Sequence, residues 1–334
     1  MTKVLIVFSI CICCLCGCAE RKNEVVIYTS LDQIFSEPIL KDFERETGIK
    51  VKAVYDVEAA KTTGLVNRLI AEKNNPRCDV FWNSEIGRTI ILKNKGILKR
   101  YDSPSAKEIP EQFKDKDRYW CGYAARARVL VYNKGLVNET DLPRSIFELT
   151  DPKWKGQVAL ANPLFGTTSV HSAALFVSLG DQKAIEFFKA LKDNDVRIVD
   201  GNSTSRDRVV AGLLKIGFTD TDDVNVALEE GKNVGMIFPD KEGIGTLLIP
   251  NTIALIKNDP NAANGKRLID YLLSKDTEEK LAFSGSLQIP VRADVNRPEH
   301  APGLDDLKWM EVDYEEVSKK MESSGRTLQK ILLQ

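Results

Sequence analysis

Histidine and cysteine are scarce in this chain of 334 residues. Its two histidines, His171 and His300, are too few for a histidine-rich zinc site and argue against a Ser-His-Asp triad. Five of the seven cysteines precede residue 19, which leaves Cys78 and Cys121 in the rest of the chain. These two thiols would be able to pair in an oxidising compartment, but their spacing does not decide whether they do.

Excess charge of either sign is also lacking. The chain has 47 lysines and arginines against 48 aspartates and glutamates, a net charge of -1. This balance gives no bulk attraction toward nucleic acid or an acidic membrane surface, so we expect neither as a partner. The composition, 43% hydrophobic and 28% charged, is that of an ordinary globular protein.

The first 17 residues are typical of a bacterial lipoprotein signal peptide. After Lys3 comes the apolar run VLIVFSICICCL, which is too short to span a bilayer and suits the core of a secretion signal. The run ends in LCGC, residues 15–18, which resembles a lipobox. We therefore expect Cys18 to be the lipidated N-terminus of a protein in the periplasm or on the outer face of the cell envelope, in contact with the membrane through its anchor alone.

Short apolar runs alternate with amphipathic helices along most of the remaining chain. EVVIYTS, KVKAVYD and CDVFWNS read as strands, and the segments between them have apolar residues at helical spacing, with Gly48 suited to end the first helix. This alternation predicts an α/β protein with parallel strands covered by helices.

Two long extended runs, residues 126–133 and 245–258, interrupt the alternation. They predict a two-lobed fold in which the chain crosses between lobes twice and both crossings form a hinge. We expect residues 18–127 in the first lobe, 128–246 in the second, and 247–334 returning to the first with the C-terminal helices. The ligand would then bind in the cleft between the lobes of a monomer.

Several of these segments together resemble a known family. VVIYTS, FERETGIKVKAVY, CDVFWNSEI, GYAARARVLVYN, LTDPKWKGQVALANP and IPNTIALIKNDPNAANGKRLIDYLLS with QIPVR resemble, in order, the periplasmic iron(III)-binding proteins of ABC transporters, within the type II periplasmic solute-binding proteins. The resemblance implies a receptor rather than an enzyme, partnered by a permease and an ATPase, with a metal ion as cargo and no catalytic cofactor.

The metal ligands of that family have no counterparts of the same type here. Its adjacent tyrosines fall by position on FTDTDD, where this chain has Asp220, Asp222 and Asp223. Its histidine falls near Asp32, and its glutamate falls at Ser84 or Glu85. Carboxylates remain suitable for a hard cation, so Asp32, Glu85, Asp220, Asp222 and Asp223 are the candidate metal ligands. Alternatively, Asp220 caps the following helix and the other two aspartates lie in its first turn.

Candidate anion-binding groups lie in three other segments. Arg126 and Arg128 match the family's RxR, which implies that one of them, and by match Arg126, holds a synergistic anion beside the metal. Gly166, Thr167 and Thr168 in PLFGTTS would present amides and hydroxyls at a helix N-terminus, unless a threonine there is only a helix cap. Asn202 and Ser203 form a comparable turn.

Three functions follow from these patterns. The first is a receptor for iron(III) or another hard cation bound with an anion. The second is a receptor for a small phosphorylated or carboxylated organic anion, held by Arg126 and the 166–169 turn. The third is an enzyme that uses Asp220-Thr-Asp222 as a metal-binding D-x-D motif, against which the lack of a nucleotide-binding glycine pattern argues. If Asp32, Asp220 and Asp222 face each other across the cleft, we further expect their repulsion to keep an empty cleft open.

The lipobox gives a first prediction. Cys18→Ala removes the acceptor of the lipid, so the variant should leave the membrane fraction, as fractionation and immunoblotting would reveal. Persistent membrane association with an uncleaved signal would contradict the lipoprotein interpretation.

Overall fold

The computed structural model describes residues 23–56 and 61–334. The strands are β1 (Glu24–Thr29), β2 (Lys50–Tyr55), β3 (Val80–Asn83), β4 (Leu98–Lys99), β5 (Cys121–Asn133), β6 (Val158–Ala161), β7 (Arg197–Val199), β8 (Ile216–Asp220), β9 (Val234–Ile237) and β10 (Leu248–Ile256). The helices are α1 (Gln33–Thr47), α2 (Thr63–Ala71), α3 (Gly87–Asn94), α4 (Gly166–Leu179), α5 (Asp181–Asp193), α6 (Asn202–Val210), α7 (Thr221–Glu229), α8 (Ala262–Leu272), α9 (Lys275–Phe283) and α10 (Tyr314–Leu332). Short 3-10 turns fill several of the connections.

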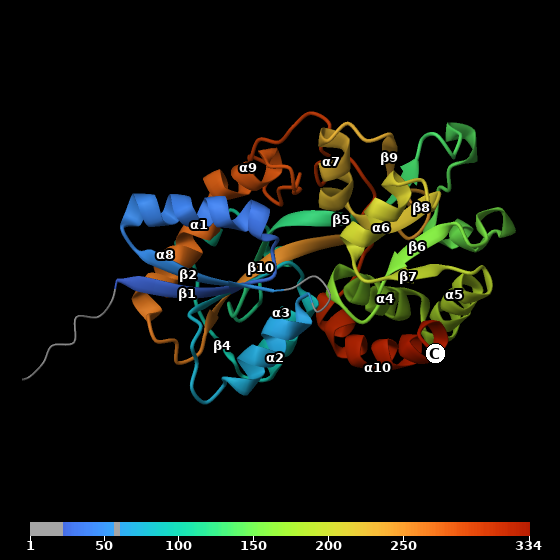
Figure 1. Ribbon diagram of the computed structural model, residues 1–334. Helices are drawn as coiled ribbons and strands as arrows, with labels where there is room; N and C mark the ends of the chain where they lie inside the picture. The colour runs from blue at the N-terminus through green and yellow to red at the C-terminus, as the bar shows by residue number, and fades with distance from the viewer. Residues whose placement is uncertain (1–22, 57–60) are drawn as a thin grey trace, which may run out of the picture.

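The strands follow the order β2-β1-β3-β10-β5-β8-β6-β7, with β4 beside β10 and β9 beside β5. Pairs β1–β2, β1–β3, β6–β7 and β6–β8 are parallel, as the strand and helix alternation predicts. Strands β1–β4 form a first group and strands β6–β9 a second group, with β5 and β10 between them. Helices α1 and α8 pack on the first group and α6 packs on the second. The predicted α/β class is therefore confirmed (Figure 1).

The two long strands β5 and β10 connect the two groups. Strand β5 pairs with β10 as far as Ala127 and with β8 from Arg128 onward, so it changes partner at that point. Strand β10 pairs in turn with β3 and β5. The chain therefore passes from the first group of strands to the second through β5 and returns to the first group through β10. The exact division into lobes stays a prediction.

The C-terminal helix α10 contacts both groups. It packs on α4 and α5 of the second group and also on α3 of the first, and Figure 1 draws it in red along the lower side of the molecule. Gly87 at the start of α3 has so little space that an added Cβ would lie 2.4 Å from Sδ of Met321 on α10. The sequence predicts this helix in the first lobe alone, whereas its contacts extend to both groups of strands.

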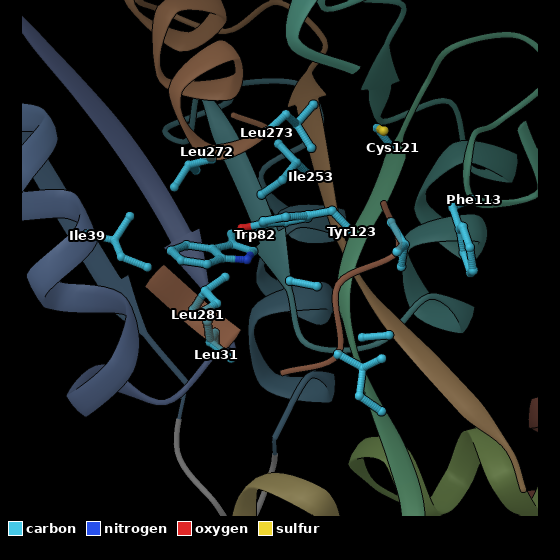
Figure 2. Close-up of a cluster of buried hydrophobic side chains, with 14 of the residues drawn as sticks. Leu31, Ile39, Trp82, Phe113, Cys121, Tyr123, Ile253, Leu272, Leu273 and Leu281 are labelled. Atoms are coloured by element: carbon cyan, nitrogen blue, oxygen red, sulfur yellow. The ribbon is translucent and has the colours of Figure 1, made fainter. Parts of the chain in front are cut away.

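Apolar side chains from distant segments form the core of the first group. Figure 2 shows Trp82 of β3 beside Tyr123 of β5, and their rings stack with centroids 6.4 Å apart. Ile39 of α1 and Leu272 of α8 close the same cluster. The two cysteines, Cys78 and Cys121, are both buried and are not joined to each other.

A buried carboxylate supports the place where β5 bends. Ala124 has φ 40°, a left-handed conformation that is costly for a residue with a Cβ, and its amide donates to the Glu278 carboxylate at 3.0 Å. Glu278 also accepts from the Val291 amide at 2.8 Å and from Arg292 at 2.5 Å. Both side chains are almost fully buried.

This arrangement gives a second prediction. Glu278→Ala leaves the Arg292 guanidinium buried without its counter-charge, so the free energy of unfolding should fall by about 3–5 kcal/mol. The neighbour Glu279 hydrogen-bonds only at the surface, to Asn296, and Glu279→Ala serves as the control, with an expected change below about 0.5 kcal/mol. Equal urea midpoints for the two variants would contradict this account of the β5 bend.

Candidate functional site

A polar pocket lies where the carboxyl ends of β6 and β8 and the middle of β5 meet the residues before α2. Its floor is formed by the first turns of α4 and α6 and by the junction between β8 and α7. The part that a water-sized sphere can occupy is about 20 Å³. The residues that line it are Lys61, Ser84, Arg126, Ala161, Asn162, Phe165, Gly166, Thr167, Thr168, Asp200, Gly201, Asn202, Asp220 and Asp223.

Asp220 and Arg128 form the most buried ion pair at the pocket. Arg128 is fully buried, and its Nη1 lies 2.5 Å from Oδ1 of Asp220. The other carboxylate oxygen accepts from the Thr167 hydroxyl at 2.6 Å and from the Asn202 amide at 2.9 Å. The Arg128 guanidinium also lies 4.7 Å from the centre of the Phe218 ring. Both Asp220 oxygens are therefore already engaged.

Asp222 is paired with Arg126 but only through one oxygen. Its Oδ2 lies 2.9 Å from Nη1 of Arg126, whereas the buried Oδ1 has no hydrogen-bond partner. Burial raises the pKa of Asp222 to about 6, with the Asp220 and Asp32 carboxylates adding to the rise and Arg126 opposing it. The Arg126 Nε is likewise buried without a partner.

Asp223 completes a cluster of three carboxylates. It accepts from the Thr219 hydroxyl at 2.9 Å, and Arg206 lies 3.9 Å away. Burial, reinforced by Asp222 and Asp220, raises the pKa of Asp223 well above its usual range. One oxygen from each of Asp220, Asp222 and Asp223 lies within 4.8 Å of the others, a geometry that would allow one cation to contact all three.

The first turn of α4 supplies groups that favour an anion rather than a cation. Thr167 and Thr168 donate to or accept from the Arg128, Asn202 and Asp220 side chains, and the helix N-terminus favours negative charge. The Gly166 amide donates to the Lys61 carbonyl at 3.3 Å, so it already has a partner across the pocket. The helix begins after Phe165, which forms no side-chain cap, so the threonine-cap alternative is wrong.

The fold agrees with comparisons to known proteins. A family model described as bacterial extracellular solute-binding protein matches residues 91–316, well over half of the chain. The chain belongs to this family. Iron uptake protein A1 of Synechocystis sp. is 28% identical over 285 residues, covering 82% of this chain and 78% of that protein.

Solved structures of similar proteins identify the fold. The ferric binding protein from Campylobacter jejuni has a TM-score of 0.83 at 22% identity, covering 92% of this chain and 99% of that chain. The periplasmic binding protein AfuA from Actinobacillus pleuropneumoniae, with exogenous fructose-6-phosphate bound, has a TM-score of 0.81 at 24% identity, covering 92% and 97%. This solute-binding protein therefore has the type II periplasmic binding fold, as predicted, and the family is not catalytic.

The only membrane contact that the sequence predicts is at the N-terminus. Within residues 23–56 and 61–334, no helix is both long enough and apolar enough to cross a bilayer. The predicted signal peptide and the lipidated Cys18 lie outside the described residues.

The helix-cap alternative is confirmed in part, because Asp222 and Asp223 lie in the first turn of α7. Asp220 stands at the N-cap position of α7, but its side chain makes no capping bond and instead binds Arg128. Repulsion among the carboxylates is reduced but not removed, because Asp220, Asp222 and Asp32 each have a cation nearby, which for Asp32 is Lys61 at 2.5 Å, while the opening of an empty cleft stays a prediction. Burial would raise the pKa of Asp32, but the Lys61 ammonium outweighs burial and lowers it.

Glu85 is not part of the pocket. Its carboxylate accepts from the Arg88 amide at 3.1 Å and from the Asn83 side chain at 3.2 Å, so it serves the N-terminus of its own helix α3. Ser84, the other candidate at this position, lines the pocket. The structure thus corrects the assignment of Glu85 as a metal ligand.

The remaining candidates lie at the mouth of the site. Asp32 and Ser203 line an adjoining pocket together with Arg206, Asp222 and Asp223. Lys61 lines both pockets, and sequence reasoning missed it because no motif marks it. Lys61 and Asp32 are 29 residues apart, so the sequence did not indicate that Lys61 would bind Asp32.

The raised pKa of Asp222 gives a third prediction. In the unfolded chain this group ionises near its ordinary pKa of about 3.9, so its contribution favours folding below that pH and is lost as pH rises through about 6. Asp222→Asn removes this penalty. The melting temperature of the variant should therefore rise relative to that of wild type from pH 4 to pH 6, and the difference should then level off. The corresponding gain in the free energy of unfolding is on the order of 2 kcal/mol.

Thermal melts of the metal-free protein in buffers from pH 4 to pH 7 measure this difference. Asp193→Asn, at an exposed position on α5, is the control and should follow wild type at every pH. If Asp222→Asn melts lower than wild type at pH 7, the ion pair with Arg126 outweighs burial and the interpretation fails.

Proposed function

We propose that this solute-binding protein is the lipid-anchored, extracytoplasmic receptor of an ABC importer, and that it binds iron(III) or another hard cation together with an anion. One observation carries the proposal: Asp220, Asp222 and Asp223 converge within 4.8 Å, and the buried Oδ1 of Asp222 has no hydrogen-bond donor. A buried carboxylate oxygen without a donor is costly, and a cation would compensate it.

The electrostatics support a cation at Asp222 and Asp223. The pKa of each is raised chiefly by burial and further by the neighbouring carboxylates, and the cations nearby do not overcome this rise. A hard cation would displace the protons and bind carboxylate oxygen, its preferred donor. Asp220 would orient the cluster through Arg128 rather than supply most of the bonding, because both of its oxygens are engaged.

An accompanying anion would bind on the other side of the pocket. Arg126 has its buried Nε without a partner, and the first turns of α4 and α6 line the same space with Thr168 and Asn202. Guanidinium and helix N-termini both favour anions. The free volume of about 20 Å³ is room for about one water molecule, so a cation with its anion would require the pocket to widen, and a larger organic solute would require it to widen further.

The names of similar proteins agree with this proposal. Iron uptake protein A1 and the ferric binding protein are named for iron, and family membership implies a permease and an ATPase as partners. We expect the receptor to act as a monomer, with no nucleic-acid partner.

A phosphorylated organic anion is the second candidate. The similar AfuA structure contains fructose-6-phosphate, and Lys61, Arg126 and the turn at Gly166 would suit a phosphate. Binding of such a solute would require the pocket to widen, because the present space is small.

Calorimetric titration with ferric citrate tests the cation proposal, and this is the fourth prediction. Binding should weaken by much more than tenfold in Asp222→Asn and remain unchanged in Asp193→Asn. Because a cation competes with the proton on Asp222, affinity should rise steeply with pH up to about 6 and less steeply above.

Fructose 6-phosphate provides the contrasting titration. If wild type binds fructose 6-phosphate, fails to bind ferric citrate, and loses the phosphate ester on substitution of Arg126, the second candidate replaces the first. Unchanged ferric citrate affinity in Asp222→Asn would likewise contradict the cation proposal.

A further inference from the structure

A buried arginine outside the pocket links the part of the molecule built on the first group of strands to the part built on the second. These two parts are the two halves of the molecule. Arg88 belongs to α3, which packs with α2 beside the first group of strands, and its guanidinium reaches the segment before α4. Its Nη1 lies 2.8 Å from the Ser169 hydroxyl, and its Nη2 lies 2.9 Å from the Leu164 carbonyl. The residue is 9% exposed, so water competes little for these bonds.

The two acceptors bracket the part of α4 that lines the pocket. Leu164 precedes and Ser169 follows the segment 165–168, all of which lines the pocket and carries the threonines bound to Arg128. The planar fork of an arginine can hold two acceptors at a fixed separation, which a lysine cannot do. The Ser169 hydroxyl also donates to the Gly166 carbonyl at 2.9 Å, so the bond from Arg88 fixes the turn itself.

Glu85 gives this arginine its counter-charge. The Glu85 carboxylate lies 3.8 Å from Nη1 of Arg88 and accepts from the Arg88 amide, and it has no exposed surface. The Glu85 carboxylate therefore compensates the buried charge of Arg88 while the guanidinium bonds to α4 and the segment before it.

Two further bonds cross between the halves beside the pocket. The Gly166 amide donates to the Lys61 carbonyl, and the Asn225 side chain on α7 donates to the Gly285 carbonyl at 3.0 Å. Arg88 differs from these because it is a buried cation that makes two charge-assisted bonds at once.

We propose that Arg88 is a positioning residue for solute binding, which holds the first turn of α4 against the first half of the molecule and so slows solute release. The proposal rests on the pocket named in the proposed function but not on which solute the pocket holds. Arg88 acts through Leu164 and Ser169 and is not among the residues that line the pocket.

The test uses two variants that leave the acidic cluster untouched. The double variant Arg88→Met with Glu85→Gln removes the bonds to α4 without leaving a buried carboxylate uncompensated. Ser169→Ala removes one of the two bonds and keeps the Glu85 pair. Arg45→Met, on the exposed side of α1, is the control for loss of an arginine. Thermal melts establish that each variant is folded.

The first readout needs no solute. Small-angle X-ray scattering should give a larger radius of gyration for the double variant than for wild type, with a smaller increase for Ser169→Ala and none for Arg45→Met. A residue with a merely structural role would lower the melting temperature and leave the radius of gyration unchanged, so equal radii in wild type and both variants would overturn the proposal.

The second readout uses ferric citrate as the probe in stopped-flow release experiments. The dissociation rate should rise about tenfold or more in the double variant, since a charge-assisted hydrogen bond in a buried site contributes that much, while the association rate stays similar. Dissociation within twofold of wild type would overturn the proposal. If ferric citrate binds to neither protein, the cation proposal fails and the radius of gyration alone decides the role of Arg88.

Discussion

The pocket depends on two ion pairs buried where β5 passes β8. Arg126 and Arg128 are two residues apart on one strand, so their side chains project on the same face. The antiparallel register places Arg128 opposite Asp220, and the turn into α7 brings Asp222 to Arg126. Removing four charges from water would cost several kcal/mol per ion without these pairings. Strand register therefore fixes which charges meet and how the pocket is shaped.

The ion pairs compensate the three carboxylates of the cluster unequally. Asp220 is fully engaged, whereas Asp222 keeps one bare oxygen and Asp223 has only a hydroxyl and a distant arginine. Burial raises the pKa of both groups, and the neighbouring carboxylates add to the rise. A solute that supplies positive charge beside an anion would compensate these carboxylates, in a pocket where the first turn of α4 already contacts Lys61. Solute chemistry and the contact between the halves are thus linked through the same few residues.

Periodicity in the sequence was sufficient for the order of strands and helices and for the end of α1, where Gly48 adopts φ 69° and its amide bonds to Glu44. The acidic cluster was also predictable, because its three members lie within four consecutive positions. Long-range pairing was not. Nothing in the sequence indicated that Arg128 would bind Asp220 or that Lys61 would bind Asp32, so repulsion was expected where compensation exists. Glu85 was misassigned because only the structure reveals that its carboxylate turns back to the amide of Arg88.

Elemental analysis of the protein purified without chelator tests the central claim most directly, because inductively coupled plasma mass spectrometry measures metals and phosphorus in one sample. The account predicts about one equivalent of iron or another hard metal per chain, largely lost from Asp222→Asn prepared in parallel. One equivalent of phosphorus with no metal in the wild-type protein would contradict it and would identify the pocket as a site for a phosphorylated solute.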